Sequence, residues 1–465
     1  MARYTPTRLL ISLLAVLSLL IFLIHSPSSS PIQALRTRSF PYARWIEDWT
    51  TQPPRAQNPL TAPPSTWGQA YEDERMSLLE EKNYDAEWMA WAIGTPEHNQ
   101  LGGNLTAYLD RLNRFVDTYF EGSPSKPALK QMLRNLGHHV PPPLLDQPMR
   151  RKVFSTCKGG KEEVPEGFNQ WERRLGPVGW EVEVADDDRM QEWFSDAIKG
   201  DGFGRGEEKF RRIWDALPKQ VLRSDLLRYL MILIHGGIYT DSDTQPRSHP
   251  FLWGTDAQSL MPPSLKAINR MLQSYSRHPA YDNLSIEPQT PESPWNYADS
   301  YRGGIGDDDV AFVASIEWDS FERDLGENWC CGYCRALQVV QWTIVAKPFH
   351  PIMLDVLETV VNNIEKGIEE NNLDGTVRAL DLTGPGPFTD AVYRYLLAQY
   401  GVTPLDLVRR PEINTKIGDV ILLPEWSFAQ PAPQPNEWDF TGPSPTFRCV
   451  SHGFMGRWKK EGWGD

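Results

Sequence analysis

Two aspartates separated by one residue are the strongest candidate for cation chemistry in this chain. Asp241 and Asp243 follow Ile238-Tyr239, a short apolar segment typical of a strand. Residues i and i+2 of a strand point to the same side, so we expect both carboxylates to face one cation while Ser242 faces away. Carboxylate oxygens suit Mg²⁺ or Mn²⁺ and leave coordination positions for phosphate oxygens. The pair alone is a weak signal, because acidic residues are common on surfaces.

A second charged pair precedes these aspartates on a strongly apolar segment. Asp225 and Arg228 are spaced i, i+3, which places them on one face of the helix predicted over 221–234. An exposed ion pair of little energetic value is the alternative. Charges on so apolar a helix are costly unless they are used at its end. Gly236-Gly237 then permits a tight turn and close backbone approach. Taken together, these residues indicate one functional site.

The elements that must position this site alternate between strand and helix patterns from residue 151 onward. We expect strands near 152–157, 180–184, 238–239, 310–316 and 419–423, and helices over 168–175, 194–217, 221–234, 336–346 and 351–368. Such alternation predicts an α/β fold with a mainly parallel central sheet flanked by helices. Ligands then bind beyond the carboxyl ends of the strands, where the aspartates lie. The Pro-, Ser- and Asn-rich segment 258–301 predicts a long loop insertion.

The residues before this region have a different organisation. We expect a cytoplasmic tail over 1–8, a transmembrane signal anchor over 9–25 and a Pro- and Ser-rich stem over 26–69. A helical region should follow over 70–150, and the catalytic domain over 151–465. Arg3 and Arg8 before the apolar run favour a cytoplasmic N-terminus. A cleaved signal peptide is the alternative, and either interpretation places the remainder in the secretory lumen. Asn104 and Asn283 begin glycosylation sequons, which agree with that compartment.

Composition excludes several classes of protein. The 465 residues carry a net charge of −14 and show no basic patch with interleaved aromatics, so we expect no nucleic-acid partner. The 18 tryptophans indicate a core with some aromatics to spare, and such spare aromatics often line carbohydrate sites, although we expect most of the tryptophans to be structural. Cys330, Cys331 and Cys334 superficially resemble half of a zinc site, but no second Cys/His pair with suitable spacing lies nearby.

The segment from Ser224 to Thr244 reads S-D-L-L-R-Y-L-x(5)-G-G-I-Y-T-D-S-D-T and resembles the signature of family 32 glycosyltransferases. Four further segments resemble the same family: 179–188, 336–351, 382–386 and 452–459. The resemblance covers roughly 151–460. Two segments differ from the family pattern: Val-Phe-Ser-Thr156-Cys157-Lys near the start of this range and Gly-Arg457-Trp near its end. The region before residue 150 has no counterpart in the family.

This resemblance implies a GT-A-like nucleotide-sugar-binding fold, a divalent cation (Mn²⁺ or Mg²⁺), a nucleotide-sugar donor and retention of anomeric configuration. It implies a catalytic set of Asp225, Arg228, Asp241 and Asp243, in which the last two hold the metal together with His452. The remaining residues of the expected donor site are Tyr229, Ser242, Thr383, Gly384 and Trp458. For three of these features a structural role is the alternative. His452 would be a packed histidine, Trp458 a core tryptophan, and Thr383-Gly384 part of a simple Gly-Pro turn.

Members of the family include fungal Golgi α-1,6-mannosyltransferases. The resemblance therefore implies a single-pass type II Golgi membrane protein with a lumenal catalytic domain. Its donor would be GDP-mannose, its acceptor a mannose-containing N-glycan, and a mannosyltransferase complex is a candidate partner. No carboxylate pair stands out as a covalent nucleophile, so we expect front-face displacement. Glu317 or one of Asp307–Asp309 is a candidate to assist it, although the aspartate run fits a solvated acidic loop better. The alternatives are mannosyl transfer to inositol-phosphoceramide and a non-catalytic glycan-binding subunit.

Overall fold

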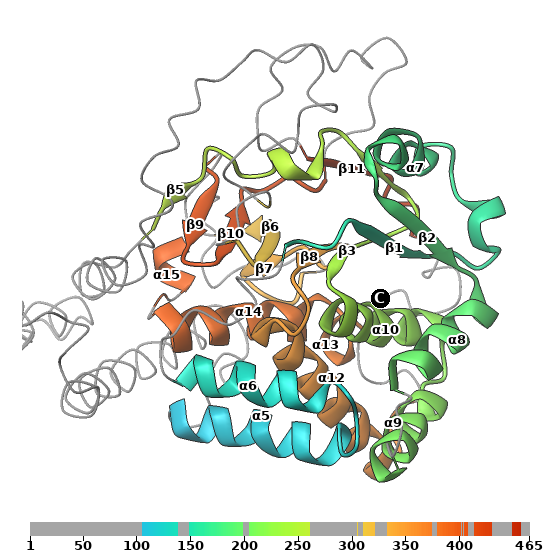
Figure 1. The fold of residues 1–465 in the computed structure, drawn as a ribbon, viewed down its shortest axis with the longest axis vertical. Coiled ribbons are helices and arrows are strands. Elements are labelled where there is room, and N and C mark those ends of the chain that lie inside the picture. The colour runs from blue at the N-terminus through green and yellow to red at the C-terminus, as the bar shows by residue number, and fades with distance from the viewer. Residues whose placement is uncertain are drawn as a thin grey trace, which may run out of the picture. The chain divides into compact units, whose positions relative to one another are not determined.

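The site is built on a mixed sheet with the strand order β2-β1-β3-β8-β6-β10-β9-β5, to which β7 adds by pairing with β6 (Figure 1). The computed structural model describes residues 105–137, 148–198, 204–260, 305, 310–320, 333–373, 379–400, 402, 404–407, 413–429 and 449–456. The sheet comprises β1 (Lys152–Thr156), β2 (Glu181–Ala185), β3 (Gly237–Thr240), β5 (Gln258–Ser259), β6 (Phe312–Asp319), β7 (Leu337–Val339), β8 (Thr343–Ala346), β9 (Thr415–Ile417) and β10 (Val420–Leu423). A separate two-stranded sheet pairs β4 (Thr244–Pro246) with β11 (Val450–His452).

Most of the central strands run in one direction. Strand β1 is parallel to β2 and β3, and β6 is parallel to β10. Strand β8 is antiparallel to both β3 and β6, so it joins two groups of strands that share one direction. The expected α/β fold with a mainly parallel central sheet is confirmed from β2 to β10, whereas β5, β7, β8 and β9 run the opposite way.

Helices cover the sheet on both faces. The described helices are α5 (Leu105–Tyr119), α6 (Lys126–Gly137), α7 (Asn169–Leu175), α8 (Asp187–Ile198), α9 (Gly204–Ala216), α10 (Gln220–His235), α12 (Pro351–Glu369), α13 (Ala379–Leu382), α14 (Pro385–Tyr400) and α15 (Pro404–Leu407). Strand residues alternate between two cores, as the period of a strand requires: Phe154 packs with α8 to α14, and Val153 packs with α7 and β11. Figure 1 shows α5, α6, α10, α12 and α14 gathered on one side of the sheet.

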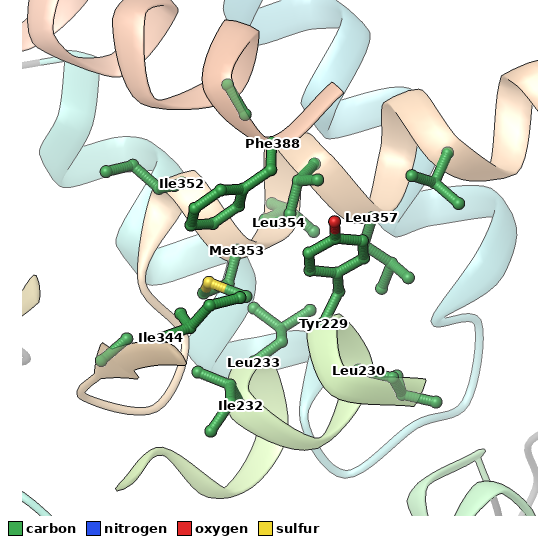
Figure 2. Close-up of a cluster of buried hydrophobic side chains, with 14 of the residues drawn as sticks. Tyr229, Leu230, Ile232, Leu233, Ile344, Ile352, Met353, Leu354, Leu357 and Phe388 are labelled. Carbon is green, nitrogen blue, oxygen red and sulfur yellow. The ribbon is translucent and has the colours of Figure 1, made fainter. Parts of the chain in front are cut away.

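Helix α10 is fixed between the sheet and two long helices, as Figure 2 shows. Tyr229 and Leu233 of α10 lie against Met353 of α12, Phe388 of α14 and Ile344 of β8. The ring of Tyr229 stacks on Phe388 with centroids 6.0 Å apart. All of these side chains are fully buried. Burial of so many apolar groups orders α10, and with it the charged residues that α10 carries.

One predicted element is wrong. The segment 336–346 was expected to be helical, but it forms β7 and β8. Its β-branched residues, among them Val339, Thr343, Ile344 and Val345, favour strands. Strand β8 also completes the hydrogen bonding between β3 and β6, which a helix could not do.

Several expectations fall outside the described residues. These are the cytoplasmic tail, the anchor, the stem, the sequons at Asn104 and Asn283, the acidic residues Asp307–Asp309, and most of the insertion predicted over 258–301, of which β5 occupies 258–259. No helix among the described residues is both long and apolar enough to cross a membrane.

The described part of the region before residue 150 shares the main core. Helices α5 and α6 contribute Tyr108, Leu112 and Leu129 to the cluster that also contains α10 and α12. Arg111 pairs with Asp355 and Glu358 of α12, and Arg394 of α14 pairs with the same Asp355 at 2.9 Å. Burial opposes ionisation of Asp355, but the two arginines outweigh it and lower the pKa of that carboxyl. The helical pair is therefore built into the sheet-bearing unit.

Candidate metal and donor site

The aspartate pair lies in a turn between β3 and β4 rather than on a strand, so the strand geometry expected for it is wrong. Strand β3 ends at Thr240, and the chain then reverses. The Asp241 N–H donates to the Trp342 carbonyl at 2.8 Å, while the Thr244 N–H and hydroxyl both donate to the Asp241 carbonyl. These bonds fix the backbone of the turn, so its carboxylates are held in place by β3 and β8.

Two glycines let α10 run directly into β3. Gly236 and Gly237 have φ values of 66° and 99°, which L side chains rarely adopt. A Cβ on Gly237 would lie 2.5 Å from the Lys152 carbonyl oxygen, and one on Gly236 would lie 2.6 Å from Pro348 Cδ. The glycine pair therefore lets β3 turn back from the end of α10, which places the aspartates beside Arg228.

A third metal-ligating side chain comes from the C-terminal end of the described chain. Strand β11 pairs with β4 so that His452 lies opposite Thr244, and His452 Nε2 reaches Asp243 Oδ1 at 3.1 Å. One ligand atom from each of Asp241, Asp243 and His452 lies within 4.8 Å of the others. The N–H groups of Gly453 and Met455 donate to Asp243, which binds the segment after β11 to the turn. The structure thus brings together the three residues that the sequence nominates as candidate metal ligands.

The cluster fits a divalent cation of borderline hardness. Burial raises the pKa of Asp241, and the neighbouring charge of Asp243 adds to this effect, while Arg228 opposes it. Burial also opposes ionisation of Asp243, but its hydrogen bond with His452 leaves the pKa of that carboxyl lowered. His452 Nδ1 has no hydrogen-bond partner among the described residues. Two carboxylates and an imidazole are a donor set that suits Mn²⁺, and a bound cation would relieve the repulsion between the carboxylates.

Arg228 connects the cation cluster to α10. Its Nη2 lies 3.0 Å from Asp225 Oδ1 and 3.3 Å from Asp241 Oδ1, and its Nη1 donates to the Gln341 carbonyl. The guanidinium also lies 4.6 Å from the centre of the Tyr239 ring, a cation–π contact. One buried arginine therefore holds carboxylates from both motifs. The expectation that the two charged motifs form a single site agrees with this geometry.

Asp225 is enclosed by hydrogen-bond donors. Thr383 Oγ1 donates to its Oδ2 at 2.8 Å, and Gln341 Nε2 donates to its Oδ1 at 3.0 Å. Burial raises the pKa of Asp225 to about 6, while Arg228, Thr383 and Gln341 act against this rise. The carboxylate is consequently ionised at neutral pH and fixed in one orientation.

Three of the expected donor-site residues are engaged inside the protein. Tyr229 is fully buried, and its hydroxyl donates to the carbonyls of Thr383 and Gly384. The N–H groups of Thr383 and Gly384 both donate to the Ala379 carbonyl. These residues lie behind Asp225 and support it. Ser242 is part of the turn and partly exposed, and Trp458 lies outside the described residues.

Sequence reasoning missed Gln341 and Trp342. Gln341 also donates to the Tyr229 hydroxyl at 2.8 Å, and the Trp342 ring stacks on His452 at 4.5 Å with an interplanar angle of 6°. Both residues belong to the segment 340–342 between β7 and β8, more than a hundred positions from α10.

Glu317, which was a candidate to assist chemistry, is half-buried on β6. Burial raises the pKa of its carboxyl to about 7, and the hydrogen bond from Gln338 opposes this rise.

Residues 176–260 match the family described as "Glycosyltransferase sugar-binding region containing DXD motif". This range contains Asp225, Arg228, Asp241 and Asp243. The match confirms the resemblance to a glycosyltransferase stated from the sequence, and Asp241-Ser242-Asp243 is a D-x-D sequence inside the matched range.

Relatives of known name extend the similarity beyond the sugar-binding region. The chain is 26% identical over 290 residues to an initiation-specific α-1,6-mannosyltransferase of Schizosaccharomyces pombe, covering 62% of this chain and 58% of that protein. It is 24% identical to the protein of the same name from Candida albicans, covering 53% and 56% of the two chains. The chain thus spans little more than half the length of these relatives.

Solved structures similar to this chain include the PaToxG glycosyltransferase, with a TM-score of 0.28 and 13% identity over 61% of this chain and 91% of that one. The ligand-free glycosyltransferase domain of the YGT toxin has a TM-score of 0.24 and 9% identity, covering 76% and 71%.

Proposed function

We propose that this protein is a metal-dependent glycosyltransferase that transfers mannose from GDP-mannose to a mannose-containing N-glycan in α-1,6 linkage. The observation that carries this proposal is the cluster of Asp241, Asp243 and His452 joined through Arg228 to Asp225. The choice of mannose and of the α-1,6 linkage rests on the names of the relatives. The mixed sheet with the DXD turn at its centre supports a GT-A-like fold.

The residues of the cluster suit the two ends of a nucleotide-sugar bond. Asp241, Asp243 and His452 would hold Mn²⁺, which supplies stabilisation of the negative charge that develops on the departing nucleoside diphosphate. Asp225 and Arg228 lie beside it and would bind the hydroxyls of the donor sugar. Because Arg228 contacts carboxylates of both groups, it couples the position of the sugar to that of the diphosphate.

Catalysis in this site would depend on orientation and charge. Asp225 is held by Gln341 and Thr383 in an ionised form, which favours positive charge developing at the anomeric carbon. Its ion pair with Arg228 makes it a poor covalent nucleophile, which supports front-face displacement with retention. In that reaction a leaving phosphate oxygen accepts the proton of the attacking hydroxyl.

We also propose that the protein is a single-pass type II protein of the Golgi membrane with its catalytic domain in the lumen. The apolar run 9–24, the preceding arginines and the two sequons support this location. Antibody accessibility of an epitope at each end, measured in selectively permeabilised cells, tests the orientation. Protection of the C-terminal epitope in the absence of detergent is the expected result.

Donor choice tests the proposed activity. The purified full chain is incubated with Mn²⁺, an oligomannose acceptor, and GDP-mannose, UDP-galactose or UDP-N-acetylglucosamine in separate reactions. We expect product only with GDP-mannose, and an α-1,6 linkage by NMR spectroscopy of that product. A preference for either UDP-sugar would refute the proposed donor, and another linkage would refute the proposed regiochemistry.

A further inference from the structure

Three large apolar side chains are exposed among the described residues, and all three belong to segments attached to the cation cluster. Trp426 is 52% exposed, Phe454 56% and Met455 48%. Phe454 and Met455 directly follow β11, and the Phe454 ring meets His452 edge-on at 4.2 Å. The Met455 N–H donates to Asp243 at 2.9 Å. Exposed apolar surface is therefore concentrated beside the metal ligands.

Trp426 is tied to the same place through its neighbours. The Ser427 carbonyl accepts hydrogen bonds from the N–H groups of Cys449 and Val450, which lead into β11. The Trp342 indole N–H donates to the Phe428 carbonyl at 2.8 Å, and the Trp342 ring stacks on His452. The segment 424–429 is thereby fixed against both β11 and the ring that supports His452.

The backbone holds both exposed aromatic residues in an unfavourable conformation. Trp426 has a φ of 72° and Phe454 a φ of 47°, values that bulky residues rarely adopt. Glycine would relieve this strain at either position, and exposed rings of this kind contribute little to the core. Strained, exposed aromatics next to a site indicate a role in ligand contact.

The charges nearby favour a neutral, hydroxyl-rich ligand over a nucleotide. Strand β10 pairs in parallel with β6 as far as Leu423 opposite Ser315, and Glu425 follows two residues after the end of β10. Glu317 of β6 accepts a hydrogen bond from Gln338 at 2.7 Å, and the charges of His452 and Glu425 both act on the pKa of its carboxyl. Carboxyl groups bind sugar hydroxyls, but they repel the phosphates of a nucleotide.

We propose that Trp426 and Phe454, together with Glu317 and Glu425, form the binding subsite for a mannose residue of the acceptor glycan. The aromatic rings contact the apolar C–H face of the sugar, and the carboxyl groups bind its hydroxyls. This subsite lies beside the metal ligands, so it presents an acceptor hydroxyl to the donor. The inference rests on the proposed function for the identity of the sugar.

Binding measurements on the full chain separate this subsite from the donor site. Isothermal titration in the presence of Mn²⁺ gives the Kd for α-linked mannotriose and, separately, for GDP. We expect Trp426→Gly to weaken mannotriose binding about tenfold and to leave the Kd for GDP unchanged. Trp426→Phe retains a ring and should keep most of the affinity. Phe454→Gly should act in the same direction as Trp426→Gly.

The stability of Trp426→Gly shows whether a loss of mannotriose binding could result from a loss of folding. Because glycine adopts a φ of 72° without strain, the melting temperature of Trp426→Gly should equal or exceed that of the wild type. Loss of GDP affinity with retained mannotriose affinity would assign the rings to the nucleotide and overturn the proposal. The proposal is also overturned if the wild type does not bind mannotriose, or if Trp426→Gly binds mannotriose as tightly as the wild type does. The proposed function fails instead if the wild type does not turn over GDP-mannose.

Discussion

At the scale of single residues, the protonation state of Asp225 controls the site. Burial raises its pKa to about 6, compared with an ordinary value of 3.8. As pH falls through about 6 this carboxylate gains a proton, and its ion pair with Arg228 is lost. We therefore expect kcat/KM for GDP-mannose to fall about tenfold between pH 7 and pH 5. Initial rates measured at fixed, saturating Mn²⁺ across this range test the prediction, and a flat profile would contradict it.

Two neighbouring substitutions show whether Asp225 is the titrating group. Thr383→Val removes the hydroxyl that donates to Asp225 Oδ2, so the pKa of Asp225 rises and the acidic limb of the profile moves to higher pH. Thr383→Ser keeps the hydroxyl and should leave the limb in place. Glu317→Gln serves as the control for the other raised carboxyl, and the limb near pH 6 should survive it. A limb that disappears with Glu317→Gln would assign the titration to Glu317.

The residues that sequence reasoning found and missed differ in their separation along the chain. Asp225, Arg228, Asp241 and Asp243 lie within nineteen positions, and their spacing on a helix and after a strand makes their proximity predictable. Gln341 joins Asp225 from 116 positions away, and no local pattern distinguishes it from other glutamines. Only the folded sheet, which places β8 next to β3, reveals its role.

At the scale of elements, the connection from α10 to β3 determines how closely the two motifs approach. Gly237→Ala would place a Cβ 2.5 Å from the Lys152 carbonyl oxygen, at a φ of 99°. We expect the free energy of unfolding to decrease by about 2 to 3 kcal/mol, measured by urea denaturation. Gly176→Ala is the matched control: Gly176 has a φ of −54°, and the nearest neighbouring atom to its added Cβ lies 3.9 Å away. Its effect should stay below about 1 kcal/mol. Equal effects of the two substitutions would show that the connection is not constrained.

Element prediction succeeded where the pattern was unambiguous. Helix α10 was expected over 221–234 and extends over Gln220–His235, because its apolar run is long and ends in glycine. The error at 336–346 arose because a short apolar run with few polar residues fits a buried helix and a buried strand equally well. Tertiary pairing with β3 and β6 decides the outcome there. The turn that carries the aspartates was likewise set by β4 pairing with β11, a contact between distant segments.

At the scale of the whole molecule, α5 is held to the unit that bears the sheet by a buried ion network. Arg111→Ala leaves Glu358 and Asp355 of α12 with less positive charge beside them in a buried setting. Arg111 itself is 27% exposed, so solvent weakens the loss, and we expect a decrease in unfolding free energy of about 1 to 3 kcal/mol. Lys126→Ala breaks a surface pair with Asp117 and should change stability by less than about 0.5 kcal/mol. A separate early unfolding transition in the wild type would contradict a shared core.

Mn²⁺-dependent turnover of GDP-mannose is the most direct measure of whether the aspartate pair binds a catalytic cation. Asp241→Asn and Asp243→Asn each remove a charged ligand, so kcat/KM should fall at least about a hundredfold. Glu181→Gln with Glu183→Gln is the matched control, since these carboxylates have the same spacing on β2 and pair with Lys152. We predict that the control variant keeps wild-type activity. Chelation of the metal should abolish the activity of the wild type. Undiminished turnover in Asp241→Asn and Asp243→Asn, or turnover that survives chelation, would show that the aspartate pair binds no catalytic cation.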